Sequence, residues 1–194
     1  MLKKLALLVV PLLFLVPSVF AATYVVDVPH SQVHFKVRHL MAFTVRGTFD
    51  DFAGQVEVDT DKKTLTGVTA TVDPASIDTR NEKRNAHLKS ADFFDVQKFP
   101  EMSFVSKTIS GSGDNITLVG ELTMKGVTRE VTLHGSFDGA TVDPWGNKRV
   151  GFSATGKIDR RDFGLNWNKA LEAGGVMVGE TVEIGLEIEA IEKA

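Results

Sequence analysis

The sequence contains no cysteine, which excludes structural disulfides, thiol nucleophiles, Cys-ligated metals and a lipid anchor on an N-terminal cysteine. Polar aromatic residues are scarce too, with 1 Tyr and 2 Trp beside 13 Phe. Because Phe needs no hydrogen-bond partner, this composition suits either a densely packed interior or an apolar cavity. Composition alone does not distinguish the two.

Motifs that mark common catalytic sites are also absent. The chain has no HExxH, no GxSxG and no glycine-rich phosphate loop followed by a helix. His30 and His34 share a strand face but lie about 13 Å apart in an extended chain, too far to hold one metal ion. The acidic residues of the expected strands fall on outward-facing positions, which disfavours a paired-carboxylate site. We therefore predict that the protein is not an enzyme and needs neither a metal nor a cofactor.

Long apolar runs are missing except at the N-terminus, where Leu5–Val16 follows Lys3 and Lys4. About twelve residues are too few to span a bilayer, which takes about 20. Val19-Phe20-Ala21 offers a cleavage site with small residues at the required positions. We predict a signal peptide over 1–21 and a single exported domain over 22–194, with no stable insertion into a membrane.

The charge of the chain is weakly acidic, with a formal net value of −3 at pH 7. Removal of the signal peptide takes two lysines with it and makes the mature charge about −5. A surface of this sign attracts neither nucleic acid nor an anionic membrane. We expect no nucleic-acid partner.

The clearest pattern runs from Ser31 to Phe49, where apolar and polar residues alternate on both sides of a short break at 40–42. Such alternation is typical of strands with one buried face, and two runs joined by a short turn predict an antiparallel hairpin. His39 continues the apolar parity of the first run. It is either a structural residue bonded to a backbone carbonyl or a polar group inside a cavity.

The rest of the chain alternates in the same way and shows no rhythm of strands separated by helices. It predicts further strands at 24–28, 52–60, 65–73, 102–109, 116–124, 129–137, 149–158 and 182–190. These patterns favour an all-β antiparallel fold in which a barrel of about eight strands closes on itself. Several inward positions are small, which leaves volume for one small ligand: Ala70, Gly120, Gly135, Ala154 and Gly156.

One segment departs from the alternation, and it predicts a short helical insert near 79–96. Thr79 with Glu82 has the spacing of a capping box, and the polar run 80–89 would be the helix. Phe93-Phe94 follows. The insert is either a lid across one end of the barrel or a surface crossover whose two Phe side chains enter the core.

Two basic clusters could bind an anionic head group or could simply be solvated: Arg80 with Lys83 and Arg84, and Arg160 with Arg161.

Taken together, the motifs of this chain resemble those of the YceI family, also called polyisoprenoid-binding or lipid-binding YceI-like proteins. The resemblance covers essentially all of 22–194. It is carried by 30–31, 33, 35 and 39, 47–49, 76–79, 81–84, 87–90, 92–95, 99–100, 120–128, 149–152 and 162–165.

This resemblance implies an extended, lipocalin-like barrel with a long apolar tunnel for an amphiphile such as a polyprenyl chain, a quinone tail or a fatty-acid derivative. Related proteins are mostly periplasmic, several are dimers, and no reaction is established for the fold. Asn85 departs from the pattern, since the family usually has an acidic residue there.

We therefore expect a periplasmic carrier that holds a lipid, with a homodimer as a further possibility. The expected tunnel residues are Phe35, Val37, Phe43, Val45, Phe49, Phe104, Leu122, Met124, Phe152 and Trp167. The expected polar end consists of His39, Arg80, Arg84, Asn85 and His87. The alternative is a stress-response or interaction protein whose barrel is packed solid. A lipid hydrolase or isomerase is disfavoured because the strand parities bring no nucleophile and base together.

Overall fold

The structure is a computed structural model and describes residues 21–172 and 174–193, so the expected signal peptide lies almost wholly outside the described residues. The elements in chain order are β1 (Ala22–Val26), η1 (Val28–His30), β2 (Gln32–His39), β3 (Phe43–Phe49), β4 (Phe52–Asp59), β5 (Thr64–Val72), η2 (Pro74–Ser76), β6 (Ile77–Asp78), α1 (Glu82–Lys89), β7 (Met102–Ser112), β8 (Asn115–Met124), β9 (Val127–Val142), β10 (Lys148–Asp159), η3 (Arg160–Phe163) and β11 (Val178–Glu192). No helix in the described part of the chain is long and apolar enough to cross a membrane.

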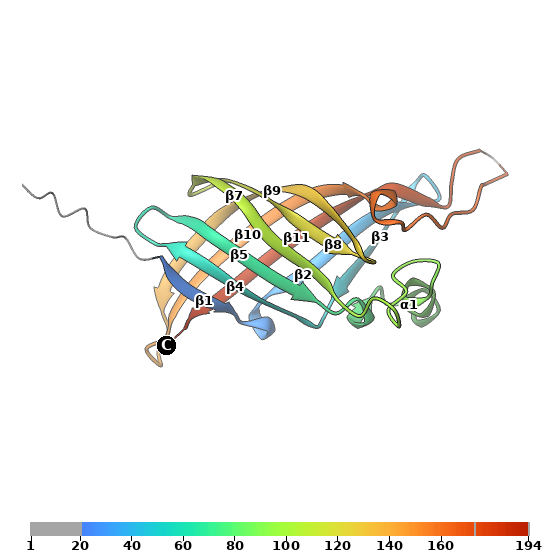
Figure 1. The fold of residues 1–194 in the computed structure, drawn as a ribbon. Coiled ribbons are helices and arrows are strands. Elements are labelled where there is room, and N and C mark those ends of the chain that lie inside the picture. Colours follow the sequence, from blue (N-terminus) through green and yellow to red (C-terminus); the bar gives the residue numbers. More distant parts are fainter. Residues whose placement is uncertain (1–20, 173, 194) are drawn as a thin grey trace, which may run out of the picture.

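All strand pairs are antiparallel, and the sheet closes on itself because β1 pairs with both β4 and β11 (Figure 1). Eight strands form the closed wall in the order β1-β4-β5-β7-β8-β9-β10-β11. β11 also pairs with β2 along its N-terminal half, so the β2–β3 hairpin continues the wall beyond the end of β1. The expectation of an all-β antiparallel barrel of about eight strands is confirmed.

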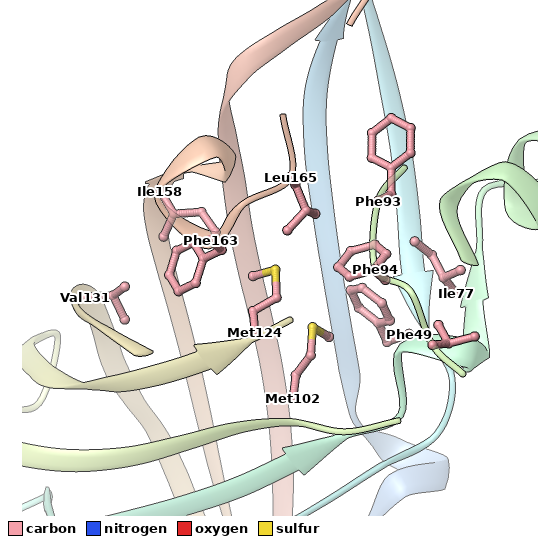
Figure 2. Packing of buried hydrophobic residues seen from close by; sticks show 11 residues of the cluster. Phe49, Ile77, Phe93, Phe94, Met102, Met124, Val131, Ile158, Phe163 and Leu165 are labelled. Atoms are coloured by element: carbon pink, nitrogen blue, oxygen red, sulfur yellow. The ribbon is translucent and has the colours of Figure 1, made fainter. Parts of the chain in front are cut away.

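Two buried clusters fill opposite parts of the barrel. We name the first the α1-end cluster: Phe49, Ile77, Phe93, Phe94, Val96, Met102, Met124, Val131, Ile158, Phe163 and Leu165. Figure 2 shows ten of these side chains labelled, gathered from strands, from η3 and from the segment after α1. We name the second the far cluster: Tyr24, Val56, Val58, Ile116, Phe137, Val150, Phe152 and Ala190.

The helical insert lies at one end of the barrel (Figure 1), but its cap differs from the expected one. Asn81 caps α1 by accepting a hydrogen bond from the Arg84 backbone N–H at 3.0 Å, whereas the sequence pattern favoured Thr79. No residue of α1 is buried, which fits its polar sequence. Phe93 and Phe94 behind it are buried, and Phe94 meets Phe49 edge-on at 5.8 Å. The segment therefore covers the barrel end and also plugs it.

An arginine holds the opposite end of the barrel together. The Arg149 guanidinium contacts Asp27 at 2.6 Å, Glu189 at 2.5 Å and Asp143 at 2.8 Å. These partners lie before η1, on β11 and in the β9–β10 turn, so one side chain ties three segments to β10. Burial raises the pKa of Asp143, but hydrogen bonds from Asn147 and Arg149 outweigh it and hold this pKa far below its ordinary value. The Arg149 hydrogen bond likewise lowers the pKa of Asp27.

This network predicts acid sensitivity. Because the folded-state pKa values of Asp27 and Asp143 lie below their ordinary value of 3.8, the unfolded chain binds more protons at low pH. We expect the contribution of this network to the free energy of unfolding to be level above about pH 5 and to fall as the pH drops towards 2. Arg149→Met should make that fall smaller while lowering stability at pH 7. Urea unfolding at pH 7 and near pH 2 measures the difference in stability between the two. Lys157→Met is the control, because it removes only an exposed ion pair of 3.7 Å. An unchanged acid response in Arg149→Met would contradict the assignment.

Candidate functional site

The barrel contains an apolar cavity of about 250 Å³. Its wall includes Phe49, Phe94 and Met102 of the α1-end cluster and reaches Val56 of the far cluster. An apolar cavity of about 150 Å³ is already large enough to bind benzene, so this space can accept part of a hydrocarbon chain. The barrel is therefore not packed solid.

Part of the expected tunnel lies in this wall. The structure places there Phe35, Val37, Phe49, Phe104, Leu122 and Met124. They come from β2, β3, β7 and β8, and each points inward because residues two apart on a strand share a face. Their role in ligand binding stays a prediction, but their position at the cavity is a property of the fold.

Aromatic rings occupy some of the space that inward glycines were expected to leave. A Cβ added to Gly47 would lie 2.5 Å from the Phe35 ring, and one added to Gly120 would collide with the Phe104 ring. Each ring therefore occupies the place that a side chain on the neighbouring strand's glycine would take. The glycines do not form the cavity by themselves, because they allow large side chains to lie along its edge.

The other four expected tunnel residues do not line the cavity. Phe43 is 64% exposed and Val45 is half-buried, because β6 pairs with β3 only at Thr48 and Phe49. No other described strand besides β2 pairs with β3 near the hairpin tip. Phe152 lies in the far cluster, 5.2 Å from the Phe137 ring, where it helps to close that end. Trp167 packs on the plug segment against Phe93 at 5.4 Å. The alternation of apolar and polar residues predicts which face of the sheet a side chain occupies, but it does not predict where along the barrel axis that residue lies.

The residues of the expected polar end form hydrogen bonds within the insert. Arg84 donates to the Thr79 hydroxyl at 2.8 Å and to the Thr79 carbonyl at 2.7 Å. The Asn85 side-chain oxygen accepts from the Thr79 N–H and hydroxyl, and its amide nitrogen donates to Asp78 at 2.9 Å. Arg80 is exposed with a left-handed backbone, φ 60°. None of the three is among the residues of the cavity wall.

These contacts explain why an amide occupies position 85. Asn85 must accept two hydrogen bonds on one atom and donate one to a carboxylate on the other. An ionised acid there would face Asp78 with no proton to donate. The Asn85 hydrogen bond is also the main reason that the pKa of Asp78 is lowered.

The two expected histidines also lie off the cavity wall. His87 contacts Asp92 at 2.8 Å and meets the Trp167 ring edge-on at 4.7 Å. His39 is half-buried at the end of β2, paired with Phe43 on one side and Val178 on the other. Among the described residues its ring makes no side-chain hydrogen bond, so neither interpretation of His39 is established.

One charged residue of the cavity wall was not included in the expected polar end, and it is Arg160. Arg160 is only 4% exposed and belongs to the cavity wall, whereas its neighbour Arg161 is exposed. Its position could have been found from the alternation, because Ile158 faces inward and Arg160 continues that parity. Burial lowers the pKa of Arg160.

A possible metal cluster lies elsewhere. Ligand atoms of Asp27, His30 and Glu189 come within 4.8 Å of one another. The Arg149 guanidinium already contacts the carboxylates of Asp27 and Glu189, so a side chain of the protein takes the place that a metal cation would occupy beside them.

Known proteins match this chain over most of its length. The YceI-like domain matches residues 24–190. UPF0312 protein SAS2572 of Staphylococcus aureus is 42% identical over 164 residues, covering 84% of this chain and 94% of that protein. UPF0312 protein SERP2314 of Staphylococcus epidermidis matches equally well in identity and coverage.

Solved structures agree with the fold. A Campylobacter jejuni YCEI protein is 28% identical, with a TM-score of 0.71 over 81% of this chain and 90% of its own. Burkholderia cenocepacia BcnA gives 0.73 at 24% identity over 85% and 99%. A polyisoprenoid binding domain from Saccharophagus degradans gives 0.66 at 14% identity over 89% and 99%. The last two show likeness of fold alone. On the extent of these matches, the chain belongs to the YceI-like family.

Proposed function

We propose that this protein is a carrier that holds an isoprenoid or acyl chain inside its barrel. The observation that supports this most is the cavity, whose wall combines Phe, Val, Leu, Ile and Met side chains from both halves of the sheet. Burial of each CH₂ group contributes roughly 0.8 kcal/mol, so a chain of several carbons can offset the cost of association.

Family and neighbours support binding over catalysis. The Saccharophagus degradans neighbour is described as a polyisoprenoid binding domain. Among the described residues, no Ser or Thr of the cavity wall is hydrogen-bonded to a histidine, so the pair needed for nucleophilic catalysis is not assembled there. A barrel that is packed solid, which was the alternative, is disfavoured by the cavity.

We further propose that the protein acts in the periplasm. Support comes from the sequence at 1–21 and from the family resemblance. The basic residues, the short apolar run and the small residues before the expected cleavage site are those of an exported chain. A homodimer remains a prediction that light scattering of the purified protein would test.

Native mass spectrometry of the full chain, purified without added lipid, tests the carrier. We expect a fraction of molecules to carry an additional mass that denaturation releases, and a solvent extract to yield the same apolar compound. Uptake of Nile red, an uncharged apolar dye, is the second measurement, because an emptied cavity should still take up a hydrocarbon ligand. A bare polypeptide mass together with no uptake of Nile red would rule the carrier out.

A further inference from the structure

The turn between β2 and β3 presents large apolar side chains to solvent. Met41 is 60% exposed and Phe43 is 64% exposed, and Leu40 beside them is exposed at 36%. We name these three residues the hairpin tip. Apolar residues scattered singly over a surface are ordinary, but three of them at one projecting turn form a contiguous patch, which is typical of an interaction site.

The backbone of the turn makes these residue types more unusual. Leu40 has φ 50° and Met41 has φ 61°, so both adopt the left-handed conformation. Gly, Asn and Asp are the residues that usually occupy it, because a large side chain is strained there. Asn or Gly would therefore connect β2 to β3 better than Leu and Met do. The apolar side chains need a reason other than formation of the hairpin.

The segment before β11 braces the hairpin tip without covering it. The Leu40 N–H donates to Met177 O at 2.8 Å. A Cβ added to Gly175 would lie 2.8 Å from Met41 Cγ, so this segment packs against the Met41 side chain. The hairpin extends past the end of β1, at the barrel end where α1 lies (Figure 1). The hairpin tip is thus held at the outer edge of that end.

The hairpin behind the tip carries only positive charge. The sequence from 32 to 49 contains Lys36, Arg38 and Arg46 and no acidic residue. Arg38 and Arg46 are exposed, and the register places Lys36 directly opposite Arg46. Within the described part of the chain, none of the three forms an ion pair. The apolar tip is therefore flanked by cations that are free to meet an anion.

Acids on neighbouring segments do not cancel this charge. On β11, Glu180 contacts Arg161 at 2.7 Å and Glu183 contacts Lys157 at 3.7 Å. The segment 164–177 contains one lysine and one acid, at 169 and 172, whose charges balance. The net charge of −3 is thus unevenly distributed, and the hairpin is a positive region on an acidic protein. The overall charge predicts no attraction to an anionic membrane, but the local charge predicts one.

A bilayer that contains anionic lipids fits both features of the hairpin. Interfacial binding becomes stronger with the apolar area that enters the bilayer and with the attraction between cations and anionic head groups. A protein partner fits less well, because a stable protein interface buries about 800 Å² on each side, more than three side chains at a turn provide. The place of the tip also fits, since Val37 of the cavity wall lies on β2 shortly before Leu40.

We propose that the hairpin tip enters the interface of an anionic bilayer while Lys36, Arg38 and Arg46 bind the lipid head groups. The contact is peripheral and spans nothing. Binding to the bilayer does not depend on the carrier function, but it adds to that function the surface at which a lipid would pass between cavity and membrane.

Co-sedimentation of the purified full chain with vesicles tests the proposal. One set of vesicles is phosphatidylcholine alone, and the other contains two parts phosphatidylcholine to one part phosphatidylglycerol. We expect wild type to bind the mixed vesicles at least about tenfold more tightly at low salt, and to lose most of this preference at about 0.5 M sodium chloride. Because 1–21 is itself apolar, wild type and variants must carry the same N-terminus, checked by mass.

Two double variants separate the charge from the apolar tip. Arg38→Gln with Arg46→Gln should lower affinity for the mixed vesicles about 10- to 30-fold, since each cation near an anionic surface contributes roughly fivefold. Met41→Asn with Phe43→Thr should lower it at least about tenfold by removing the apolar side chains. Asn suits the left-handed backbone and Thr suits a strand, so this variant should fold as well as wild type by circular dichroism.

Trp145→Ala is the matched control. Trp145 is 81% exposed in the β9–β10 turn, at the opposite end of the barrel, so the substitution removes an even more exposed aromatic ring and should leave vesicle binding unchanged. Equal binding of wild type to the two kinds of vesicle would overturn the proposal, and so would binding that survives in both double variants.

The same proteins distinguish the other possible occupants of the tip. A dimer that Met41→Asn with Phe43→Thr dissociates, together with no binding to vesicles, would assign the hairpin tip to a second copy of the chain and overturn the proposal. Uptake of Nile red by wild type measures the carrier function separately. Loss of that uptake with vesicle binding intact would refute the carrier and still support the bilayer contact.

Discussion

Ala70→Phe is expected to weaken the uptake of hydrocarbon ligands at least about tenfold while the barrel remains folded. Ala70 lies in the cavity wall on β5, between Gly54 of β4 and Phe104 of β7. Because Gly54 has no side chain, a new ring at position 70 has room to enter the cavity. Displacement of even two ligand CH₂ groups costs about 1.6 kcal/mol, so affinity should fall at least about tenfold.

Titration with Nile red and native mass spectrometry measure this loss. Thr66→Phe is the matched control, since it adds the same ring to an exposed position on the same strand and should leave uptake unchanged. Stability should stay within about 3 kcal/mol of wild type, because added bulk in a space that is already open causes limited strain. Undiminished uptake in a folded Ala70→Phe protein would show that ligand binds outside the cavity.

Phe163→Ala should lower the free energy of unfolding strongly. Phe163 is 1% exposed in the α1-end cluster, and it ends the short helix η3 that also carries Arg160 (Figure 2). Removal of a fully buried Phe side chain leaves a cavity and lowers the free energy of unfolding by about 3–5 kcal/mol. Because η3 carries Arg160, a residue of the cavity wall, ligand uptake should weaken as well.

Urea unfolding monitored by circular dichroism measures the change. Phe43→Ala supplies the comparison, because it removes the same side chain from a position that is 64% exposed. Its effect should remain within about 0.5 kcal/mol. If the two variants lost similar stability, the interior of the α1-end cluster would be packed less tightly than its exposure values indicate.

The alternation of residue types was sufficient to predict the barrel. The predicted hairpin is present as β2 and β3, with Val37 opposite Val45 and His39 opposite Phe43. Phe35 and Leu122, which share the inward parity, both lie in the cavity wall. Successive side chains of any strand point to opposite faces of the sheet, so the alternation can be recognised in each strand without knowing its neighbours.

Position along the barrel could not be predicted in this way. Phe43 and Phe152 have the same inward parity as Phe35, yet one lies beyond the wall and the other closes the far end. The positions of Phe43 and Phe152 along the barrel axis depend on how the β2–β3 hairpin and β10 pair with strands that are distant in the sequence. The residues expected at the polar end lie off the cavity wall for a related reason, because Arg84 and Asn85 find partners within their own segment.

Arg160 is the opposite case. The alternation predicts that it faces inward, but its charge favoured an exposed position. The parity that placed Ile158 inside also placed Arg160 inside, but an arginine beside a second arginine is typical of a solvated turn. A charged residue at an inward position next to the end of a strand can therefore be buried when backbone carbonyls accept its hydrogen bonds, as those of Gly179 and Leu165 do here.

Closure of the wall by β1 and β11 has a consequence for biosynthesis. These strands lie at opposite ends of the chain, with Tyr24 opposite Glu192. A ribosome that adds about 5–20 residues per second needs roughly 10–30 s to produce the chain between them. Throughout that time the apolar faces of the earlier strands have been synthesised, but the sheet cannot close over them. Chaperones that shield hydrophobic segments should therefore be needed until the final strand emerges.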